Sequence, residues 1–320
     1  QRYLGDIISN TAKTRKALME GKWKTKGFHE FDLMERGKLR HIRSVHISER
    51  VVQRCLCDNV LVPVFSAAFI YDNAASLKDK GIDFAMDRMN CHLQRHVRKH
   101  GLKGGILVYD FSDYFNSAPH GPIYRENERR ITDGRVRAVA NGLMEDFGPV
   151  GFGLGSQVSQ IDALMLPNGL GHFIKEELRI RGAGRYMDDG YLIHEDVAYL
   201  KTCQEAVLTK CRELGIRMNR KKTRIVKLGE ARFLKTKFLV TQTGRVVRKM
   251  HRKSARKMRE KLKKFRRWVD EGTMTREDVR TAYESWRGHM RRGNSWKVLR
   301  RMDKYYRKLY ESGDWRDNHV

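Results

Sequence analysis

The sequence feature that most constrains the fold is a nearly continuous apolar run that ends in a carboxylate. The segment GGILVYDFSDYF, residues 104–115, has the length and composition of a buried strand and predicts that this strand ends at Asp110. A buried charge is costly unless it is compensated. Asp110 is therefore a candidate functional residue rather than a packing residue.

A second acidic feature lies in GAGRYMDDGYLIH, residues 182–194, which we expect to form a β-hairpin with Asp188 and Asp189 in its turn. Aspartate tolerates the backbone conformation of tight turns, so this pair alone could be structural. Together with Asp110 it can form a cluster of three carboxylates, which requires cations to be stable. Two Mg²⁺ ions about 3.5–4 Å apart would neutralise the cluster and support in-line phosphoryl transfer.

The charge of the whole chain indicates a polyanionic partner. Its 320 residues include 66 Lys and Arg against 38 Asp and Glu, a net charge of +28, and nucleic acid is the commonest partner of so basic a protein. A membrane surface is the weaker alternative because no amphipathic anchor is evident. The longest stretch without charges or amides, residues 60–71, is too short to span a bilayer. No secretory signal opens the chain, so we expect a cytoplasmic protein without a membrane partner.

Composition and periodicity predict an α+β fold in three units: residues 1–100, 101–243 and 244–320. The last unit is basic and helical, because the final 80 residues carry 25 Lys and Arg against 10 Asp and Glu. The elements expected in the first two units are a strand pair at 28–34 and 39–45 joined across residues 35–37, a helix from 48 to 61 that ends before Pro63, helices at 159–179 and 197–214, and a second strand pair within 224–240.

The motif RYMDD, preceded by the strand-ending aspartate of VYDFSDYF, resembles the reverse transcriptase family, whose hairpin reads Y-x-D-D and whose first palm strand carries D-x-x-x-x-[FY]. The resemblance extends over about residues 10–310, with further motifs in the same order. It implies an RNA-directed DNA polymerase with a right-hand fold. Residues 1–100 would be the fingers, 101–243 the palm with an antiparallel sheet backed by helices, and 244–320 the helical thumb.

The resemblance also implies roles for the residues around the carboxylates. Asp110 and Asp188 would be ligands of two Mg²⁺ ions, which Mn²⁺ can replace, and Asp189 would be the supporting third carboxylate. Phe115, five residues after Asp110, would exclude a ribose 2′-OH and so select deoxynucleotides; the alternative is a core aromatic. Lys222 in LGIRMNRKKT would protonate the departing pyrophosphate, with neighbouring Lys221 as the residue that could be confused with it.

Contacts with the incoming dNTP and with the primer are implied in the same way. Arg40 in GKLRHI would contact the triphosphate. Many family members carry an Arg-Pro-Gly turn where this chain has AASLKDKGIDFA, so Lys78 or Lys80 would supply the missing cation. The residues expected at the primer are Tyr186 and Met187 beneath its end, and Phe233 and Leu234 turned toward it from the primer-grip segment 231–238.

The segment GFGLGSQVSQ, residues 151–160, carries the information on subclass. Most family members have a glutamine where this chain has Leu154, and the pattern from Leu154 to Gln160 resembles diversity-generating retroelement enzymes. Such enzymes misincorporate opposite template adenines and act with a small basic helical-bundle accessory protein. An aliphatic side chain in place of an amide removes hydrogen-bonding capacity beside the nascent base pair. Our hypothesis is therefore that Leu154 lowers the fidelity of synthesis.

The basic last unit is expected to follow the backbone of the template RNA and of the cDNA/RNA duplex, which proteins recognise by shape, phosphates and 2′-OH groups. Its candidate contacts, at helical spacing, are Arg252, Lys253, Arg256 and Lys263. Two alternatives stay open. One is another bacterial or phage reverse transcriptase class, namely group II intron-like, retron or phage-defence. The other is a vestigial polymerase that acts only as an RNA-binding module.

Overall fold

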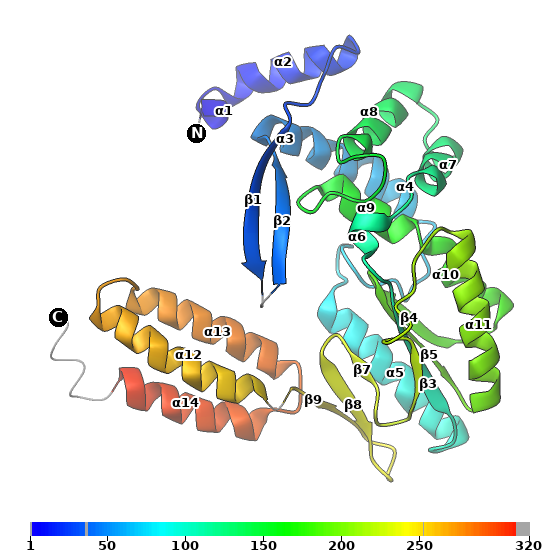
Figure 1. Ribbon diagram of the computed structural model, residues 1–320, viewed down its shortest axis with the longest axis vertical. Helices are drawn as coiled ribbons and strands as arrows, with labels where there is room; N and C mark the ends of the chain where they lie inside the picture. Colours follow the sequence, from blue (N-terminus) through cyan, green and yellow to red (C-terminus); the bar gives the residue numbers. More distant parts are fainter. Residues whose placement is uncertain (1, 36–37, 252, 312–320) are drawn as a thin grey trace.

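The computed structural model describes residues 2–35, 38–251 and 253–311. The chain forms a mixed helix-and-sheet fold in which a four-stranded sheet is covered by helices. A long β-hairpin forms a separate two-stranded sheet that extends from the upper helices in the view, and a helical bundle stands at the lower left (Figure 1). None of the helices in these ranges is long and apolar enough to cross a membrane.

The elements are, in chain order, α1 Arg2–Gly5, α2 Ile7–Met19, β1 Phe28–Glu35, β2 Lys38–Val45, α3 Ile47–Leu56, a π-helical turn Cys57–Leu61, α4 Val62–Ser66, α5 Ile82–His100, β3 Gly105–Asp110, α6 Tyr114–Ser117, α7 Gly121–Arg130, α8 Gly134–Glu145, α9 Gln157–Met165, α10 Asn168–His172, a π-helical turn Phe173–Glu177, β4 Gly182–Tyr186, β5 Asp189–His194, α11 Val197–Glu213, β6 Arg224–Lys227, β7 Arg232–Phe233, β8 Thr236–Val240, β9 Val246–Lys249, α12 Lys253–Asp270, α13 Arg276–Arg291 and α14 Trp296–Tyr310.

The central sheet has the order β4-β5-β3-β6 with all neighbours antiparallel. Its strand β3 ends at Asp110, and β4 and β5 form the hairpin, as the sequence predicted. Both faces of β3 are buried: Leu107 and Tyr109 belong to a core shared with α9 and α11, whereas Ile106 lies in a second core with α5 and β8. Because side chains alternate between the two faces of a strand, burial of both faces explains why this run is continuously apolar.

The helices α12, α13 and α14 pack around a core of their own, in which Tyr283 stacks on Tyr306 with ring centroids 4.4 Å apart and an interplanar angle of 4°. The lysines and arginines of α12 are exposed, apart from Arg266, which is half-buried and donates to Leu309 O of α14, so the bundle presents a basic surface. It is tied to α5 by an ion pair of 2.8 Å between Arg292 Nε and Asp83 Oδ1, and the strand β9 that precedes it is tied to α5 by a pair between Arg248 and Asp87.

Two expected helices differ from the structure. The helix from 48 to 61 does not end before Pro63 but widens into the π-helical turn, where Val62 N–H donates to Cys57 O, and continues as α4. Pro63 lies at the start of that continuation, where its missing N–H is tolerated. The helix expected at 159–179 is interrupted at Pro167, which separates α9 from α10.

The strand pair expected within 224–240 is present as β7 and β8, but the segment begins with a further strand, β6. The strand β6 pairs with the edge of β3 and completes the central sheet, which satisfies backbone groups that an open edge would leave unpaired. The strands β7 and β8 form a hairpin with left-handed residues at Leu234 and Lys235. Strand β9, which lies in the stretch expected to be helical, pairs with β8. The turn expected at residues 35–37 lies largely outside the described residues.

Candidate functional site

The structure brings the three predicted carboxylates to one end of the central sheet. Asp110, the last residue of β3, is directly paired with Asp189, the first residue of β5. Asp188 precedes it in the hairpin turn, and its carbonyl accepts a hydrogen bond of 3.1 Å from Phe111 N, which fixes the turn against the end of β3. Met187 completes the turn in a left-handed conformation, with φ of 52°. Asp110 is buried and the other two carboxylates are half-buried.

The electrostatics of the cluster follow from its burial. Burial, followed by the charges of Asp188 and Asp110, raises the pKa of Asp189 to about 7. Burial also raises the pKa of Asp188, with Asp110 adding to the effect, while the charges of Lys222 and Arg40 oppose it. The carboxylates therefore disfavour one another's ionised form, and nearby cations offset part of that cost.

Lys222 supplies the closest of these cations. Its Nζ lies 2.8 Å from both carboxylate oxygens of Asp110, and this hydrogen bond raises the pKa of the lysine. The loop that carries it is attached to the end of β3, because Asn219 N donates to Asp110 O at 2.8 Å. Lys221 lines the same cavity of about 190 Å³ beside Asp110 and Asp189. Of the two lysines, Lys222 is thus the one whose ammonium contacts a carboxylate.

The cations predicted to contact a triphosphate have different surroundings. Arg40 extends from β2, and its charge lowers the pKa of Asp188, which places its guanidinium in the field of the carboxylates. Lys78 is exposed. Lys80 is half-buried, and its Nζ donates to Tyr71 O at 2.8 Å and to Asn73 O at 3.0 Å. In this conformation Lys80 holds its own loop together, and its contact with a nucleotide stays a prediction.

Phe115 lies on the short helix α6 and is half-buried between two other aromatic rings. It meets Tyr114 and Phe152 edge to face, with centroids 5.8 and 6.3 Å away. Gly151 is the reason that the 151–160 segment can approach this residue so closely. Its φ is +92°, and a Cβ on it would lie 2.9 Å from Phe115 O. The predicted gate and the predicted subclass segment are therefore in direct contact.

The 151–160 segment forms a loop that leads into α9. Ser156 caps the helix by accepting a hydrogen bond from Ser159 N at 3.2 Å, and Ser159 Oγ accepts one from Gly153 N at 3.1 Å. Leu154 is half-buried at the tip of this loop, and Gln160 is exposed on the first turns of α9. The role of Ser159 as the residue that fixes the loop was not predicted from the sequence.

The residues predicted to contact the primer differ in how far they are buried. Tyr186 is half-buried at the end of β4. Phe233 does not turn outward as expected: it is 3 % exposed and packs edge to face on Tyr191 with centroids 5.0 Å apart. This orientation buries a large apolar side chain that would otherwise face water. Leu234 is half-buried in the adjoining turn.

The cations predicted to contact the duplex, where the structure describes them, are all exposed on α12. They are Lys253, Arg256 and Lys263, which lie on the helix face opposite Met258 and Leu262 of the bundle core. Arg256 is paired with Glu260 at 3.0 Å in the next turn. Arg252 lies outside the described residues. The predicted helical spacing thus holds for the three described members of the set.

Sequence reasoning missed Arg185, which is almost fully buried directly behind the hairpin turn. Its Nη1 donates to Met187 O and its Nη2 to Leu164 O, both at 3.0 Å. Arg185 thus links the turn that carries the aspartates to α9. A cation inside an otherwise apolar strand was the available signal, because a buried charge needs a specific partner.

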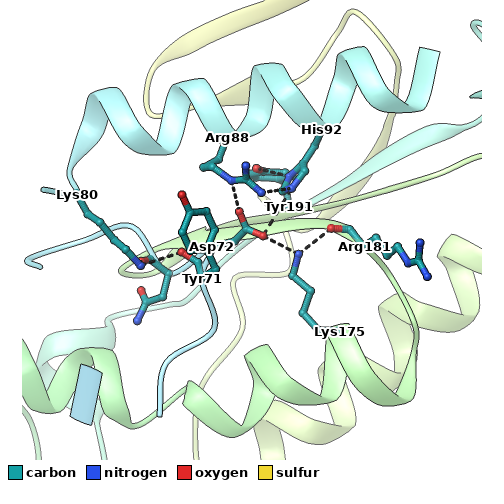
Figure 2. Close-up of polar contacts among 9 residues, drawn as sticks. Tyr71, Asp72, Lys80, Arg88, His92, Lys175, Arg181 and Tyr191 are labelled. Carbon is teal, nitrogen blue, oxygen red and sulfur yellow. Dashed lines mark hydrogen bonds and ion pairs between the residues drawn. The ribbon is translucent and has the colours of Figure 1, made fainter. Parts of the chain in front are cut away.

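A buried ionic network around Asp72 was missed as well (Figure 2). Asp72 Oδ1 lies 2.6 Å from Arg88 Nε of α5, and Oδ2 lies 2.8 Å from Lys175 Nζ, which also donates to Arg181 O at 2.7 Å. The backbone carbonyl of Asp72 accepts from Arg185 N at 3.0 Å. This network ties the loop before α5 to the strand that leads into the hairpin.

The carboxylates have the chemistry expected of a magnesium site. Mg²⁺ prefers oxygen ligands and is commonly held by one or two carboxylates together with substrate phosphates. Asp110 and Asp188 provide such oxygens, and the raised pKa of Asp188 and Asp189 indicates a cluster that added positive charge would stabilise. Among the described residues no group of three or more His, Cys, Asp and Glu side chains is arranged to hold a metal ion.

The sequence matches no protein-family model and no curated protein sequence. Among solved structures the chain is similar to telomerase from Candida tropicalis, with a TM-score of 0.54 and 11 % identity over 96 % of this chain and 64 % of that one. A C-terminally truncated form of the same enzyme gives 0.53 and 12 % over 76 % and 60 %. Telomerase from Candida albicans in complex with a telomeric RNA fragment gives 0.52 and 14 % over 93 % and 58 %.

This chain spans about three fifths of the length of those telomerases. At such low identity the likeness concerns the fold. It extends over most of the chain. The chain therefore shares a mixed helix-and-sheet fold with these telomerases.

Proposed function

We propose that this protein is an RNA-directed DNA polymerase that extends a DNA primer on an RNA template. The observation that carries the proposal is the pairing of Asp110 with Asp189 at the end of the central sheet, beside Asp188 and in contact with Lys222. The polymerase fold, the strongly basic chain and the exposed cations of α12 support it. In this proposal the β1–β2 region is the fingers, the central sheet is the palm and the helical bundle is the thumb.

Asp110 and Asp188 would hold two Mg²⁺ ions, which when bound would lower the pKa of the primer 3′-OH and stabilise the charge of the leaving pyrophosphate. Asp189 would add negative charge that favours this binding. Arg40 would orient the triphosphate of the incoming dNTP from the β2 side, because its charge already acts on Asp188. Positioning and charge stabilisation account for most of the catalysis of such reactions.

Lys222 is the group that would move a proton in this reaction. Contact with Asp110 keeps its Nζ protonated by raising its pKa, so it can donate to a pyrophosphate oxygen as the bond to the α-phosphorus breaks. Phe115 would exclude the 2′-OH of a ribonucleotide from a position next to the Gly151 loop. Its contact with Phe152 would hold the ring in place.

Primer extension with purified protein tests the proposal. The wild type is expected to extend a DNA primer annealed to an RNA template when Mg²⁺ and dNTPs are present. The Asp188→Ala, Asp189→Ala variant is expected to lose extension while it still binds the duplex. Glu128→Gln, which changes an exposed carboxylate on α7, is the matched control. Duplex binding by a wild type that makes no cDNA would favour the vestigial RNA-binding module instead.

The finer proposal is that the enzyme belongs to the diversity-generating class and is error-prone at template adenines. It is supported by Leu154, an aliphatic side chain on a loop that reaches the Phe115 region through Gly151. In this proposal Gln160 contacts the nascent pair and a small basic helical-bundle protein is a partner. Group II intron-like, retron and phage-defence enzymes are the alternatives, and they share the three aspartates.

The error spectrum of the cDNA separates these classes. Leu154→Gln restores the amide and is expected to lower misincorporation opposite adenine more than opposite the other three bases. Leu154→Met, which keeps the position apolar, is the matched control and is expected to leave the spectrum unchanged. Equal error rates at all four bases in the wild type would contradict the diversity-generating assignment while leaving the polymerase proposal intact.

A further inference from the structure

A second cationic site lies at the other end of the central sheet. A cavity of about 500 Å³ is formed between α5, residues 179–182 and the end of β5. Strand β5 begins at Asp189 and ends at His194, which lines the cavity. At about 3.3 Å per residue the cavity lies about 17 Å along the strand from the carboxylates. It is therefore separate from the proposed catalytic site.

The rim of this cavity carries four exposed cations: Arg95 and Lys99 from α5, and Arg179 and Arg181 from the segment before β4. Within the described ranges none of the four side chains forms an ion pair with an acidic side chain. Glu195 is the acid that lines the cavity, and it lies 3.7 Å from His100 and 3.5 Å from His194. The rim thus has a positive surplus that the protein itself leaves uncompensated.

The floor of the cavity is neutral. His92 and His96 are buried there, and burial is the main cause that lowers the pKa of both, that of His92 to about 4. Their ring nitrogens have partners within the protein: His92 Nδ1 lies 3.0 Å from Tyr191 Oη, and His96 Nε2 lies 2.8 Å from Lys103 O. The charge that a ligand meets near neutral pH is therefore that of the arginines and the lysine on the rim.

Like charges that surround a concave surface repel one another, and the field that they focus attracts an anion of high charge density. Arg179 also has φ of 52°, an uncommon conformation for a residue with a Cβ atom. In this conformation Arg179 lies on the rim beside Arg181. Phosphate groups are suited to such an arrangement, because arginine binds them through two parallel hydrogen bonds.

We propose that this cavity is a second RNA-binding site, which takes the sugar–phosphate backbone of RNA outside the polymerase site. The choice of RNA as the ligand rests on the proposed polymerase function, whereas the affinity for phosphate groups rests on the cavity alone. RNA held there would be anchored to the same α5 helix that is tied to the helical bundle through Asp83 and to strand β9 through Asp87. Template RNA would then stay bound while the duplex moves through the catalytic site.

The test compares two double variants that each remove two exposed cations. Arg179→Ala, Arg181→Ala changes the rim, and Arg98→Ala, Lys201→Ala changes exposed residues that do not line the cavity. Binding of a fluorescein-labelled RNA hairpin is measured over a series of salt concentrations without dNTPs. Loss of two phosphate contacts is expected to make the slope of log K against log salt less negative by about 1.5 in the rim variant only.

Extension of a short primer–template by the rim variant is expected to match the wild type, because the catalytic residues are unchanged. Equal slopes for the two variants would overturn the proposal. If inorganic tripolyphosphate binds the wild type but not the rim variant, while both proteins bind RNA equally, the cavity is a site for small oligophosphates. That result would also overturn the proposal. If the wild type makes no cDNA but the rim variant still differs from the control variant in slope, the polymerase function is refuted and the cavity remains an RNA site.

Discussion

The carboxyl group of Asp162 allows a quantitative test of how burial affects ionisation and stability in this protein. Asp162 lies on α9, is 2 % exposed, and its Oδ1 has no hydrogen-bond partner. Burial raises its pKa from 3.8 to about 8. Between these two values the folded protein keeps a proton on Asp162 that the unfolded chain has lost. Unfolding then releases a proton, and stability falls as the pH rises through this window.

The magnitude follows from the size of the shift. One pKa unit corresponds to about 1.4 kcal/mol. Relative to its stability below pH 3.8, where Asp162 is protonated in both states, the wild type is therefore destabilised by about 4 kcal/mol at neutral pH and by about 6 kcal/mol above pH 8. Asp162→Asn removes the titration and keeps the shape of the side chain. The buried amide adds a cost of about 1–3 kcal/mol that does not vary with pH. The difference between variant and wild type is therefore expected to change by several kcal/mol with pH in favour of the variant.

Urea unfolding followed by circular dichroism at constant ionic strength measures this difference. The series should extend from about pH 5 to about pH 9, which covers most of the window between 3.8 and about 8 and the plateau above it. Asp79→Asn, at an exposed position, controls for the loss of one negative charge. Parallel stability curves for Asp162→Asn and the wild type would refute the reasoning, because they would show that Asp162 is ionised in the folded protein throughout the range.

Three further changes test the catalytic end of the sheet. Lys222→Met is expected to lower kcat by about 10²–10⁴ through loss of the proton donor, and Lys222→Arg to restore little of it; single-turnover rates over a pH series check this. Arg185→Met removes two charged hydrogen bonds and is expected to cost about 2–4 kcal/mol of stability and to slow extension, because the turn at Met187 loses its support; Arg185→Lys should retain part of both. Gly153→Ala would place a Cβ 2.0 Å from an aromatic ring and is expected to cost about 1–3 kcal/mol, whereas Gly142→Ala, which meets nothing within 4 Å, should cost nothing; thermal unfolding compares the two.

Local sequence patterns were enough to predict the centre of the site. The strand that ends at Asp110 is encoded by a continuous apolar run, because both of its faces are buried. The hairpin follows from two short strands on either side of a turn that tolerates aspartate. Once both are placed, the antiparallel register sets Asp110 opposite Asp189. Lys222 rather than its neighbour contacts Asp110, and its role as the proton donor stays a prediction.

The remainder depends on contacts between residues far apart in the chain, which local patterns do not contain. Asp72 meets Arg88 and Lys175, the latter 103 residues away, and nothing in the segment around Asp72 indicates these partners. Phe233 was expected to face the primer because its motif resembles a primer grip, but the core next to Tyr191 buries it. The helix through Pro63 continues because a π-helical turn precedes the proline, a rare local geometry that no propensity predicts.

Burial separates two ion pairs of this protein that have the same chemistry. Asp72 is 7 % exposed and its partners Arg88 and Lys175 about 20 %, so the loss of one partner would leave a charge without compensation at a cost of about 3–5 kcal/mol. The Asp72 network is accordingly suited to a fixed structural role. Lys222 reaches Asp110 with a side chain that is 59 % exposed, whereas the side chain of Asp110 is 9 % exposed, so only the lysine stays in water. Its ammonium can therefore leave Asp110 at little cost to itself, and in the proposed reaction bound Mg²⁺ would compensate the carboxylate while Lys222 delivers a proton to pyrophosphate.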